Sequence, residues 1–171
     1  VQITKEKSNT IHTPSWSPDG QYIAVTRGVM SSRSVAAGEI WIYHHTGGSG
    51  TKVKAGTYGA FNQKNITDPK FSPDGKYLYY TQDITGGRVW QYNKNATSEL
   101  FNIIRHDLNT GEEESYIGGA GGAVIPTPSP DGKYMAYLKR ENDKTVLYIK
   151  DLKKGTDTRL YTEMERDNQE T

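Results

Sequence analysis

Histidine is the residue type in this chain with the widest chemistry, and two of its four copies are adjacent, at His44 and His45. Neutral imidazoles are common metal ligands, so a pair of them could begin a metal site. The surrounding residues favour a strand, and neighbouring strand residues point to opposite faces of a sheet. We therefore expect the two rings not to share one ion, and the sequence predicts no metal ligand and no cofactor-binding residue in this segment.

A histidine also stands beside a carboxylate, at His106 and Asp107. Such a pair resembles a general base and the group that orients it. Alternation along a strand separates the two side chains, and Asp107 lies where a turn begins. We expect no catalysis there.

Three aspartates recur at equivalent places in the chain, Asp19, Asp74 and Asp131, at spacings of 55 and 57 residues. Two carboxylates held close together could act as a general acid and a general base. Equivalent positions of a repeated unit lie far apart around a ring, so we interpret these aspartates as turn formers. The sequence therefore predicts no catalytic residue.

Two further kinds of motif have structural explanations. The glycine-rich run Gly118–Gly122 would cradle a phosphate only if it opened a helix, and a strand is expected after it, so we interpret the run as a flexible connection. The segments Asn65-Ile66-Thr67 and Asn95-Ala96-Thr97 match the N-glycosylation pattern, which is frequent by chance and is irrelevant in a bacterial protein.

The repeated aspartates belong to a longer motif, Ser-Pro-Asp-Gly followed by Gln or Lys, then Tyr, then apolar residues. Proline presets φ at the second position of a turn, aspartate can bond its local backbone, and glycine accepts the positive φ that ends the turn. The motif therefore predicts a hairpin turn with a strand on either side. Its residues are Ser17, Pro18, Asp19 and Gly20, then Ser72, Pro73, Asp74 and Gly75, then Ser129, Pro130, Asp131 and Gly132.

Two more strands are expected downstream of each turn, separated by a glycine-bearing turn of their own. Four antiparallel strands in each repeat make the blade of a β-propeller, whose sheets pack face to face around a channel. The expected third and fourth strands are Glu39–Tyr43 with Thr51–Lys54, Asn102–His106 with Glu113–Ile117, and Val146–Lys150 with Thr158–Tyr161.

The predicted fold class is all-β: a partial β-propeller of about three four-stranded antiparallel blades plus one outer strand of a preceding blade. The extra strand is Val1-Gln2-Ile3-Thr4, because no Ser-Pro-Asp-Gly turn precedes it. We expect residues 1–171 to form a single propeller segment. Its parts are the outer strand of a preceding blade (1–8), three blades (9–55, 56–118 and 119–162) and the start of the next connection (163–171).

Composition agrees with this fold and excludes several kinds of site. The 18 glycines and 12 tyrosines fit turn-rich strands. The absence of cysteine excludes disulfides, a thiolate zinc site and a cysteine nucleophile. The formal charge is +1 and no apolar run is long enough to cross a bilayer, so neither nucleic acid nor a membrane is an expected partner.

The long connections of the predicted blades all fall on one face, because second-to-third loops and blade-to-blade connections share it. They are residues 27–38, 57–68, 83–99 and 118–124. Elaborated loops on a rigid scaffold often carry recognition, and aromatic residues and arginine dominate binding hot spots. The alternative is that such residues pack the loops against neighbouring blades. The candidate partner-binding residues are Arg33, Tyr58, Phe61, Trp90 and Tyr92.

Three blades do not close a ring, because closed propellers have typically four to eight, and two apolar faces are left uncovered. We expect the remaining blades to belong to the parent chain. The alternative is a homodimer, in which a second copy completes a ring of about six blades.

The segment Trp16–Ala24 resembles the PD40 repeats of TolB-like propellers, and the resemblance covers nearly the whole chain. The segments Arg33–His44, Gly121–Gly132 and Arg166–Glu170 look like the propeller portion of bacterial amidohydrolases. In that family a TolB-like propeller precedes a metal-dependent hydrolase barrel. The resemblance implies a parent that hydrolyses C–N bonds, with a divalent metal held in the barrel by a His-x-His pair and further His and Asp ligands. This chain contains no such pair.

These observations predict a non-catalytic propeller module of a larger bacterial TolB-like amidohydrolase, acting in domain packing, substrate access or protein interaction. The alternative is a Tol-type periplasmic propeller that binds protein partners and has no enzyme attached. A free-standing propeller enzyme, such as a lyase or a glycosidase, would need clustered ionisable groups near the channel mouth, and the sequence supplies none. The family implies a periplasmic or secreted location.

Overall fold

The chain folds into strands alone: the computed structural model contains fourteen β-strands and no helix in the residues that it describes. These residues are 2–4, 6–7, 9–30, 36–59, 62–86, 98–142 and 144–160, without the side chains of residues 30, 36, 58, 59 and 62. The expected all-β fold class is confirmed.

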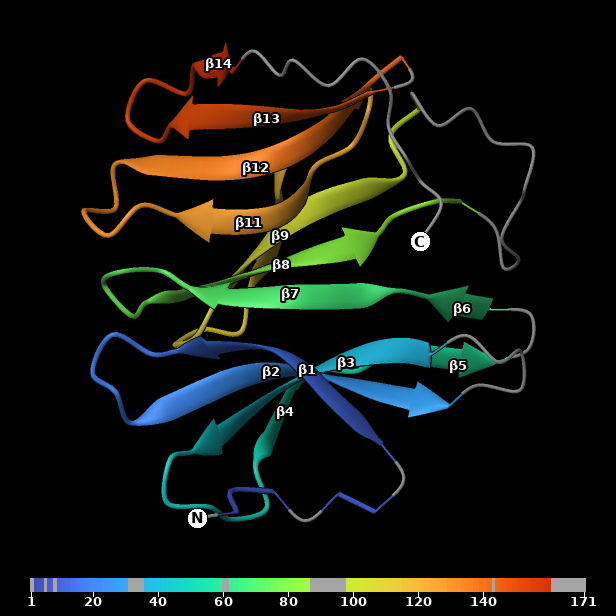
Figure 1. Ribbon diagram of the computed structural model, residues 1–171, viewed down its shortest axis with the longest axis vertical. Coiled ribbons are helices and arrows are strands. Elements are labelled where there is room, and N and C mark those ends of the chain that lie inside the picture. The colour runs from blue at the N-terminus through green and yellow to red at the C-terminus, as the bar shows by residue number, and fades with distance from the viewer. Residues whose placement is uncertain are drawn as a thin grey trace.

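Twelve of the strands form three four-stranded antiparallel sheets, each with its strands in chain order. The sheets stack face to face along the long axis of the molecule as three blades of a partial propeller (Figure 1). The first sheet contains β1 (Thr10–Trp16), β2 (Tyr22–Met30), β3 (Ala36–His44) and β4 (Thr51–Lys54); the second contains β7 (Ile66–Phe71), β8 (Tyr77–Asp83), β9 (Phe101–Asp107) and β10 (Glu113–Ile117); the third contains β11 (Val124–Pro128), β12 (Tyr134–Glu141), β13 (Lys144–Asp151) and β14 (Asp157–Arg159).

The Ser-Pro-Asp-Gly turns join the first and second strands of each sheet, as the sequence predicts. In the first copy the Ser17 hydroxyl donates to Asp19 Oδ1 at 2.5 Å, and the same oxygen accepts the backbone N–H of Gln21 at 3.0 Å. Gly20 donates its N–H to the Ser17 carbonyl oxygen at 2.9 Å and has φ +70°, which lies in the left-handed region that favours glycine. The same bonds recur in the other two copies.

All three of these turns lie at one edge of the stack, on the left of Figure 1, together with the turns between third and fourth strands. The small hairpin of β5 (Thr57–Gly59) and β6 (Asn62–Lys64) lies at the opposite edge, beside the end of β2 and the start of β3. Of the predicted long connections, the one at residues 57–68 therefore lies at the edge opposite the short turns.

Two connections differ from the sequence prediction. β2 and β3 pair as far as Met30 with Ala36, so the expected loop over residues 27–38 is mostly strand. The expected loop over residues 57–68 contains the β5–β6 hairpin and the start of β7. Strands of three residues show too little alternation to be recognised in a sequence.

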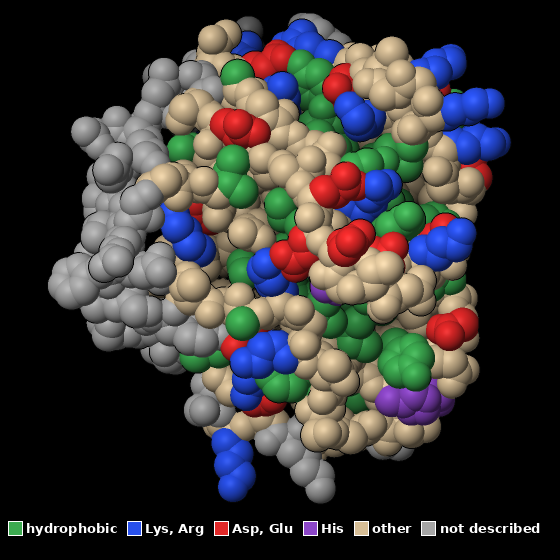
Figure 2. Space-filling view, turned by 180° about the vertical axis from the view of Figure 1, so that it is seen from behind, with side chains coloured by type: hydrophobic (Ala, Val, Ile, Leu, Met, Phe, Trp, Pro, Cys, Tyr) green, Lys and Arg blue, Asp and Glu red, His purple; other side chains and the backbone are tan. Residues whose placement is uncertain are grey.

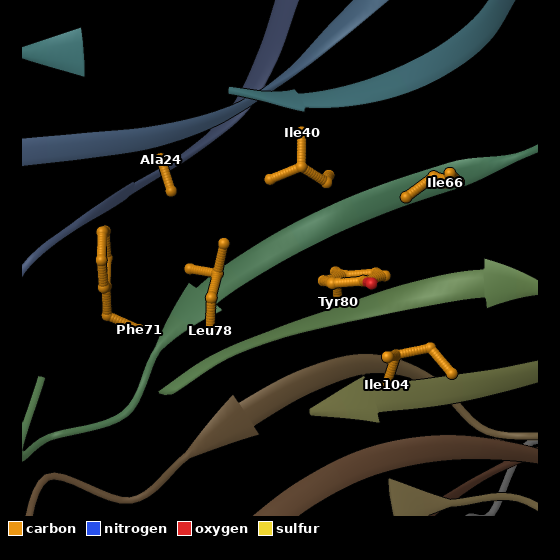
Figure 3. Close-up of a cluster of buried hydrophobic side chains, with 7 residues drawn as sticks. All are labelled: Ala24, Ile40, Ile66, Phe71, Leu78, Tyr80 and Ile104. Atoms are coloured by element: carbon orange, nitrogen blue, oxygen red, sulfur yellow. The ribbon is translucent and has the colours of Figure 1, made fainter. Parts of the chain in front are cut away.

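Clusters of buried hydrophobic side chains fill the spaces between the sheets. The cluster between the first and second sheets contains Ala24 and Ile40 from one sheet, and Leu78 and Tyr80 from the other (Figure 3). All four are fully buried. The cluster between the second and third sheets consists of Tyr79, Ile103, Ile117, Ala123, Met135 and Tyr137.

A bulge with unusual backbone geometry interrupts the first strand of every sheet. The residue before a proline has positive φ in each case: Thr13 (+51°), Asp68 (+58°) and Ile125 (+57°). The ladder register shifts at the same place. Positive φ is strained in β-branched residues such as Thr and Ile, so neighbouring contacts must hold these bulges in place.

Threonines of the preceding sheet supply such contacts to two of the bulges. Thr26 Oγ1 accepts the N–H of Asp68 at 3.2 Å, and Thr81 Oγ1 accepts the N–H of Ile125 at 3.0 Å. Both threonines lie in the second strand of their sheet and are buried. The equivalent residue of the third sheet is Leu138, which has no hydroxyl group.

The N-terminal residues do not form the predicted outer strand: residues 2–4 have no strand assignment, and they pair with no strand of the described chain. A strand needs a neighbouring strand for its backbone hydrogen bonds, and the described residues place no such strand beside residues 2–4. Ile3 instead packs on the face of the first sheet that turns away from the second. Glu6 accepts hydrogen bonds there from Arg27 Nε at 3.0 Å and Tyr43 Oη at 3.2 Å.

Candidate functional site

His44 and His45 lie closer together than strand alternation predicts. β3 ends at His44 and His45 comes next, in the turn, so the alternation is broken and the ring centroids are 4.7 Å apart. The predicted separation of the two rings is therefore wrong. His44 Nδ1 is hydrogen-bonded to Thr46 Oγ1 at 2.7 Å. Across the described ranges, no group of three or more His, Cys, Asp or Glu residues is placed to hold a metal ion.

His106 pairs with a glutamate rather than with its neighbour Asp107. Its Nδ1 lies 3.2 Å from Glu113 Oε1 across the β9–β10 pair, whereas Asp107 accepts backbone N–H groups of the adjoining turn. Glu113 also accepts the Tyr80 hydroxyl at 2.6 Å and binds Lys54 of the first sheet. Burial opposes ionisation of Glu113, but the hydrogen bonds from Lys54 and Tyr80 outweigh it and lower the pKa. The cluster thus joins two blades.

The repeat aspartates are each bonded within their own turn. The Ser17 hydroxyl holds the pKa of Asp19 below its ordinary value, and the equivalent serine lowers the pKa of Asp74. In the third turn the Ser129 hydroxyl lowers the pKa of Asp131 to about 2. Carboxylates this acidic are weak bases near neutral pH, so their geometry and acidity fit turn formation.

The glycine run forms a packed turn between the second and third sheets. Gly122 donates its N–H to the Gly119 carbonyl oxygen at 2.8 Å, and Gly119 donates to Glu99 Oε1 at 2.7 Å. A Cβ atom at Gly121 would lie 2.0 Å from the Arg140 carbonyl oxygen, so close backbone approach explains the glycine there. A strand comes after the run, not a helix.

The side chains of all five candidate partner-binding residues lie outside the described part of the chain. Arg33, Phe61, Trp90 and Tyr92 lie outside the described residues. Tyr58 belongs to β5, but its side chain is also outside them. Of the two glycosylation-like segments, the one at 65–67 spans the start of β7 and the one at 95–97 lies outside the described residues.

A groove of about 670 Å³, here called the first groove, lies between the first and second sheets and is lined by residues of two Ser-Pro-Asp-Gly turns. Its size falls in the range of binding sites for small molecules. Tyr22, one of its walls, is 44% exposed. The sequence did not single out this groove, because it is built from two repeats. Its lining residues are Ser17, Pro18, Asp19, Tyr22, Ile42, Thr51, Lys52, Val53, Phe71, Asp74, Gly75, His106 and Leu108.

A buried carboxylate organises the outer face of the first sheet. Glu39, which is 2% exposed, accepts hydrogen bonds from Trp41 Nε1 at 2.7 Å, Lys52 Nζ at 2.9 Å and Arg27 Nη1 at 3.1 Å. The Arg27 guanidinium also lies 4.8 Å from the centroid of the Trp41 ring. A buried charge needs such partners, so this network has a structural explanation.

The two outward faces of the stack carry residue types that the inner faces bury. Trp16 occupies the repeat position of Phe71, and Trp16 is 58% exposed whereas Phe71, between two sheets, is 8% exposed. On the third sheet, the cross-strand pairs Leu138–Leu147 and Ala136–Ile149 lie on the outer face. They occupy the positions that face the next blade in the other two sheets.

The surface shows no large region of one charge on the face drawn in Figure 2, where acidic, basic and hydrophobic side chains are interspersed. The nearly balanced formal charge of +1 agrees with this distribution. Among the described residues, no helix has the length and apolar character needed to span a membrane.

No family model matches the chain. Among curated proteins, the uncharacterized peptidase YuxL of Bacillus subtilis (strain 168) is 30% identical over 97 residues, which cover 56% of this chain and 14% of that protein. The chain therefore corresponds to a small part of this relative.

Solved structures share the fold. TolB from Acinetobacter baumannii matches with a TM-score of 0.65 at 23% identity, over 92% of this chain and 34% of that chain. The putative TolB from Agrobacterium tumefaciens gives a TM-score of 0.64 at 20% identity, over 93% and 51%. The β-propeller domain of the Trilobed protease from Pyrococcus furiosus, described as an open velcro topology, gives 0.58 at 16%, over 92% and 45%. The chain thus has the fold of about three TolB-like blades and spans between a third and a half of these chains.

Proposed function

We propose that this TolB-like propeller segment is a non-catalytic module of a larger bacterial hydrolase of C–N bonds, and that it serves in domain packing, substrate access or protein interaction. The observation that carries the proposal is the pair of outward faces. Trp16 at one end, and Leu138 with Ile149 at the other, keep the positions that the inner faces use to bind a neighbouring blade. Such faces are completed by another blade or domain.

The ionisable groups support a non-catalytic role. Glu39 and Glu113 each accept or pair with several side chains, and these partners link strands or blades. The repeat aspartates are engaged in turns. The hydroxyl groups of Thr46 beside His44 and of Ser17 beside Asp19 belong to turns, which supports a structural role for these contacts.

The protein that contains this segment is proposed to be a hydrolase on two grounds. The sequence relation to a peptidase and the resemblance to amidohydrolase propellers both favour a parent that cleaves amide or peptide bonds. A divalent metal would then belong to the catalytic domain, and we place the protein in the periplasm or outside the cell. The second candidate, a Tol-type propeller that binds proteins and has no enzyme attached, is favoured by the fold match to TolB.

The solution mass of the 171-residue chain by light scattering, together with unfolding at several concentrations, tests whether the faces need a cover. We expect self-association and a concentration-dependent unfolding transition. A stable monomer whose unfolding is independent of concentration would contradict the proposal. The parent gene then separates the two candidates: a His-x-His segment after Thr171 supports the hydrolase, and further blades alone support the binding propeller.

A further inference from the structure

The first groove has a counterpart between the second and third sheets, here called the second groove, of about 510 Å³. The two occupy equivalent places, because each is lined by a Ser-Pro-Asp-Gly turn of one blade and the corresponding turn of the next. Tyr22 in the first groove corresponds to Tyr77 in the second. The second groove is lined by Ser72, Pro73, Asp74, Tyr77, Tyr79, Pro128, Pro130, Asp131, Gly132 and Leu152.

An arginine of the chain itself stacks on Tyr77, a residue that lines the second groove. The Arg105 guanidinium carbon lies 4.6 Å from the ring centroid of Tyr77 and 4.6 Å from that of Tyr116. Arg105 also forms an ion pair with Glu114. Tyr79 and Tyr116 lie with their ring centroids 5.6 Å apart. Three tyrosine rings and a guanidinium therefore pack together in this part of the interface.

The corresponding residues of the first sheet are smaller. The cross-strand pair Tyr79 with Arg105 becomes Ala24 with Ile42. The bulge residue of the fourth strand, which is Tyr116 in the second sheet, is Val53 in the first. The first groove therefore lacks a guanidinium of the chain itself like the one that stacks on Tyr77 beside the second groove. The first groove has the apolar side chain of Ile42 at the position that Arg105 occupies in the second sheet.

The charges around the first groove leave one carboxylate without an ion pair in the described chain. Asp74 and Asp131 pair with Lys76 and Lys133 of their own turns, but the first turn has Gln21 at that position. Asp19 lines the first groove and forms none of the ion pairs found among the described residues. The groove thus combines a carboxylate with an exposed tyrosine ring.

The two basic residues that line the first groove, Lys52 and His106, have partners already. Lys52 Nζ binds Glu39 at 2.9 Å, and His106 Nδ1 lies 3.2 Å from Glu113. Neither is left to neutralise Asp19. The charge on the turn side of the groove is therefore complementary to a cation.

We propose that the first groove binds an arginine side chain presented by a protein partner. The aliphatic stem lies on Ile42, Val53 and Phe71, the planar guanidinium stacks on Tyr22, and Asp19 supplies the carboxylate. Within the chain, the Arg105 guanidinium stacks on Tyr77 and pairs with the Glu114 carboxylate; the proposed complex has the same kinds of contact between two molecules. Lysine is a weaker occupant, because its ammonium group cannot stack as a plane.

The test is a two-dimensional NMR titration of the full chain with acetyl-Gly-Gly-Arg-Gly-Gly-amide. Peptides with lysine, citrulline or tyrosine in place of arginine are compared with it. We expect shifts at the backbone amides around Asp19, Tyr22 and Val53, and binding about fivefold weaker for lysine and for the uncharged citrulline. Equal binding of lysine, tighter binding of the tyrosine peptide, or no localised shift at high peptide concentration overturns the proposal.

Variants make the test specific. Tyr22→Leu and Asp19→Asn should each weaken binding about fivefold, and Tyr77→Leu in the second groove, the matched control, should leave it unchanged. Ile42→Arg should abolish binding, because it places an arginine of the chain itself in the groove. Val53→Tyr fills the groove without a charge and should also abolish binding. If one of these two variants does not fold, the other still tests whether the groove is the binding site. Binding that survives both fillings contradicts the proposal.

Discussion

The Thr81 hydroxyl oxygen accepts the backbone N–H of Ile125 at 3.0 Å, so a side chain of the second sheet holds the strained bulge of the third. The replacement Thr81→Val keeps the shape of the side chain and removes the acceptor. We expect the free energy of unfolding to fall by about 1–2 kcal/mol, because the Ile125 N–H loses its partner. Urea unfolding monitored by circular dichroism measures the change. The matched control is Thr158→Val on the exposed strand β14, which should change stability by less than about 0.5 kcal/mol.

Asp68 should make the protein less stable as its carboxyl group ionises. Burial raises the pKa of Asp68 in the folded state. The folded chain then holds this proton more tightly than the unfolded chain, so the contribution to stability is present at low pH and is lost as pH rises through the folded pKa. Asp68→Asn removes the charge and tolerates positive φ. We expect the variant to be more stable than the wild type at pH 7 and nearly equal to it at pH 3. Urea unfolding at both pH values decides, and a variant less stable at pH 7 would show that the carboxylate is required.

Asp131 should have the opposite pH dependence. The Ser129 hydroxyl and the Lys133 N–H lower its pKa to about 2 from an ordinary value of 3.8. A lowered carboxyl pKa contributes stability above the ordinary pKa, and this contribution is lost as pH falls toward 2. Asp131→Asn should therefore destabilise the chain at pH 7, with a difference from the wild type that shrinks below about pH 4. Thermal unfolding across this range checks the sign, and a difference that grows on acidification would refute the assignment.

Gly38 allows the first and second sheets to approach closely. A Cβ atom there would lie 1.7 Å from the Ile66 carbonyl oxygen, which is a backbone atom and cannot move aside alone. We expect Gly38→Ala to lower the free energy of unfolding by about 3 kcal/mol or more. Gly20→Ala is the control, because its Cβ would meet no atom within 4 Å and only its φ of +70° is unfavourable; a loss of about 1 kcal/mol is expected. Similar losses in both variants would contradict the close approach.

Trp16 and Phe71 occupy the same repeat position in different surroundings. Phe71→Ala should lower the free energy of unfolding by about 3–5 kcal/mol, because it opens a cavity between two sheets. Trp16→Ala should change the stability of the monomer by less than about 1 kcal/mol, because the ring is 58% exposed. The same variant should weaken self-association in light scattering. A large loss of monomer stability at Trp16 would mean that the ring is part of a core.

The repeat made most of the fold predictable. Pro18, Asp19 and Gly20 specify the turn through local geometry, and the fourth strand at Thr51–Lys54 has the predicted bounds. Backbone rules of this kind act within a few residues, so they can be read along the chain. The prediction of an N-terminal strand failed because strand formation depends on a partner that local residues do not supply.

The contacts between blades could not be predicted in the same way. Glu113 reaches His106 across a hairpin and Lys54 from another blade, so sequence neighbours such as Asp107 are the wrong partners to consider. One signal was present but unused: Pro14, Pro69 and Pro126 stand at the same repeat position, directly after the residues with positive φ. Three aligned prolines in otherwise variable strands indicate a special backbone conformation.

The presence of Leu138 at the position of the two threonines changes the kind of neighbour that the third blade can accept. In the first two blades an oriented hydrogen bond sets the rotation of the next sheet. The Leu138 side chain offers only non-directional contact, whose strength depends on the apolar area that is covered and not on a fixed angle. A neighbour that packs on Leu138 can therefore be rotated differently from the sheets inside the stack. It also need not be another copy of the repeat, because no hydrogen bond from this position has to be matched.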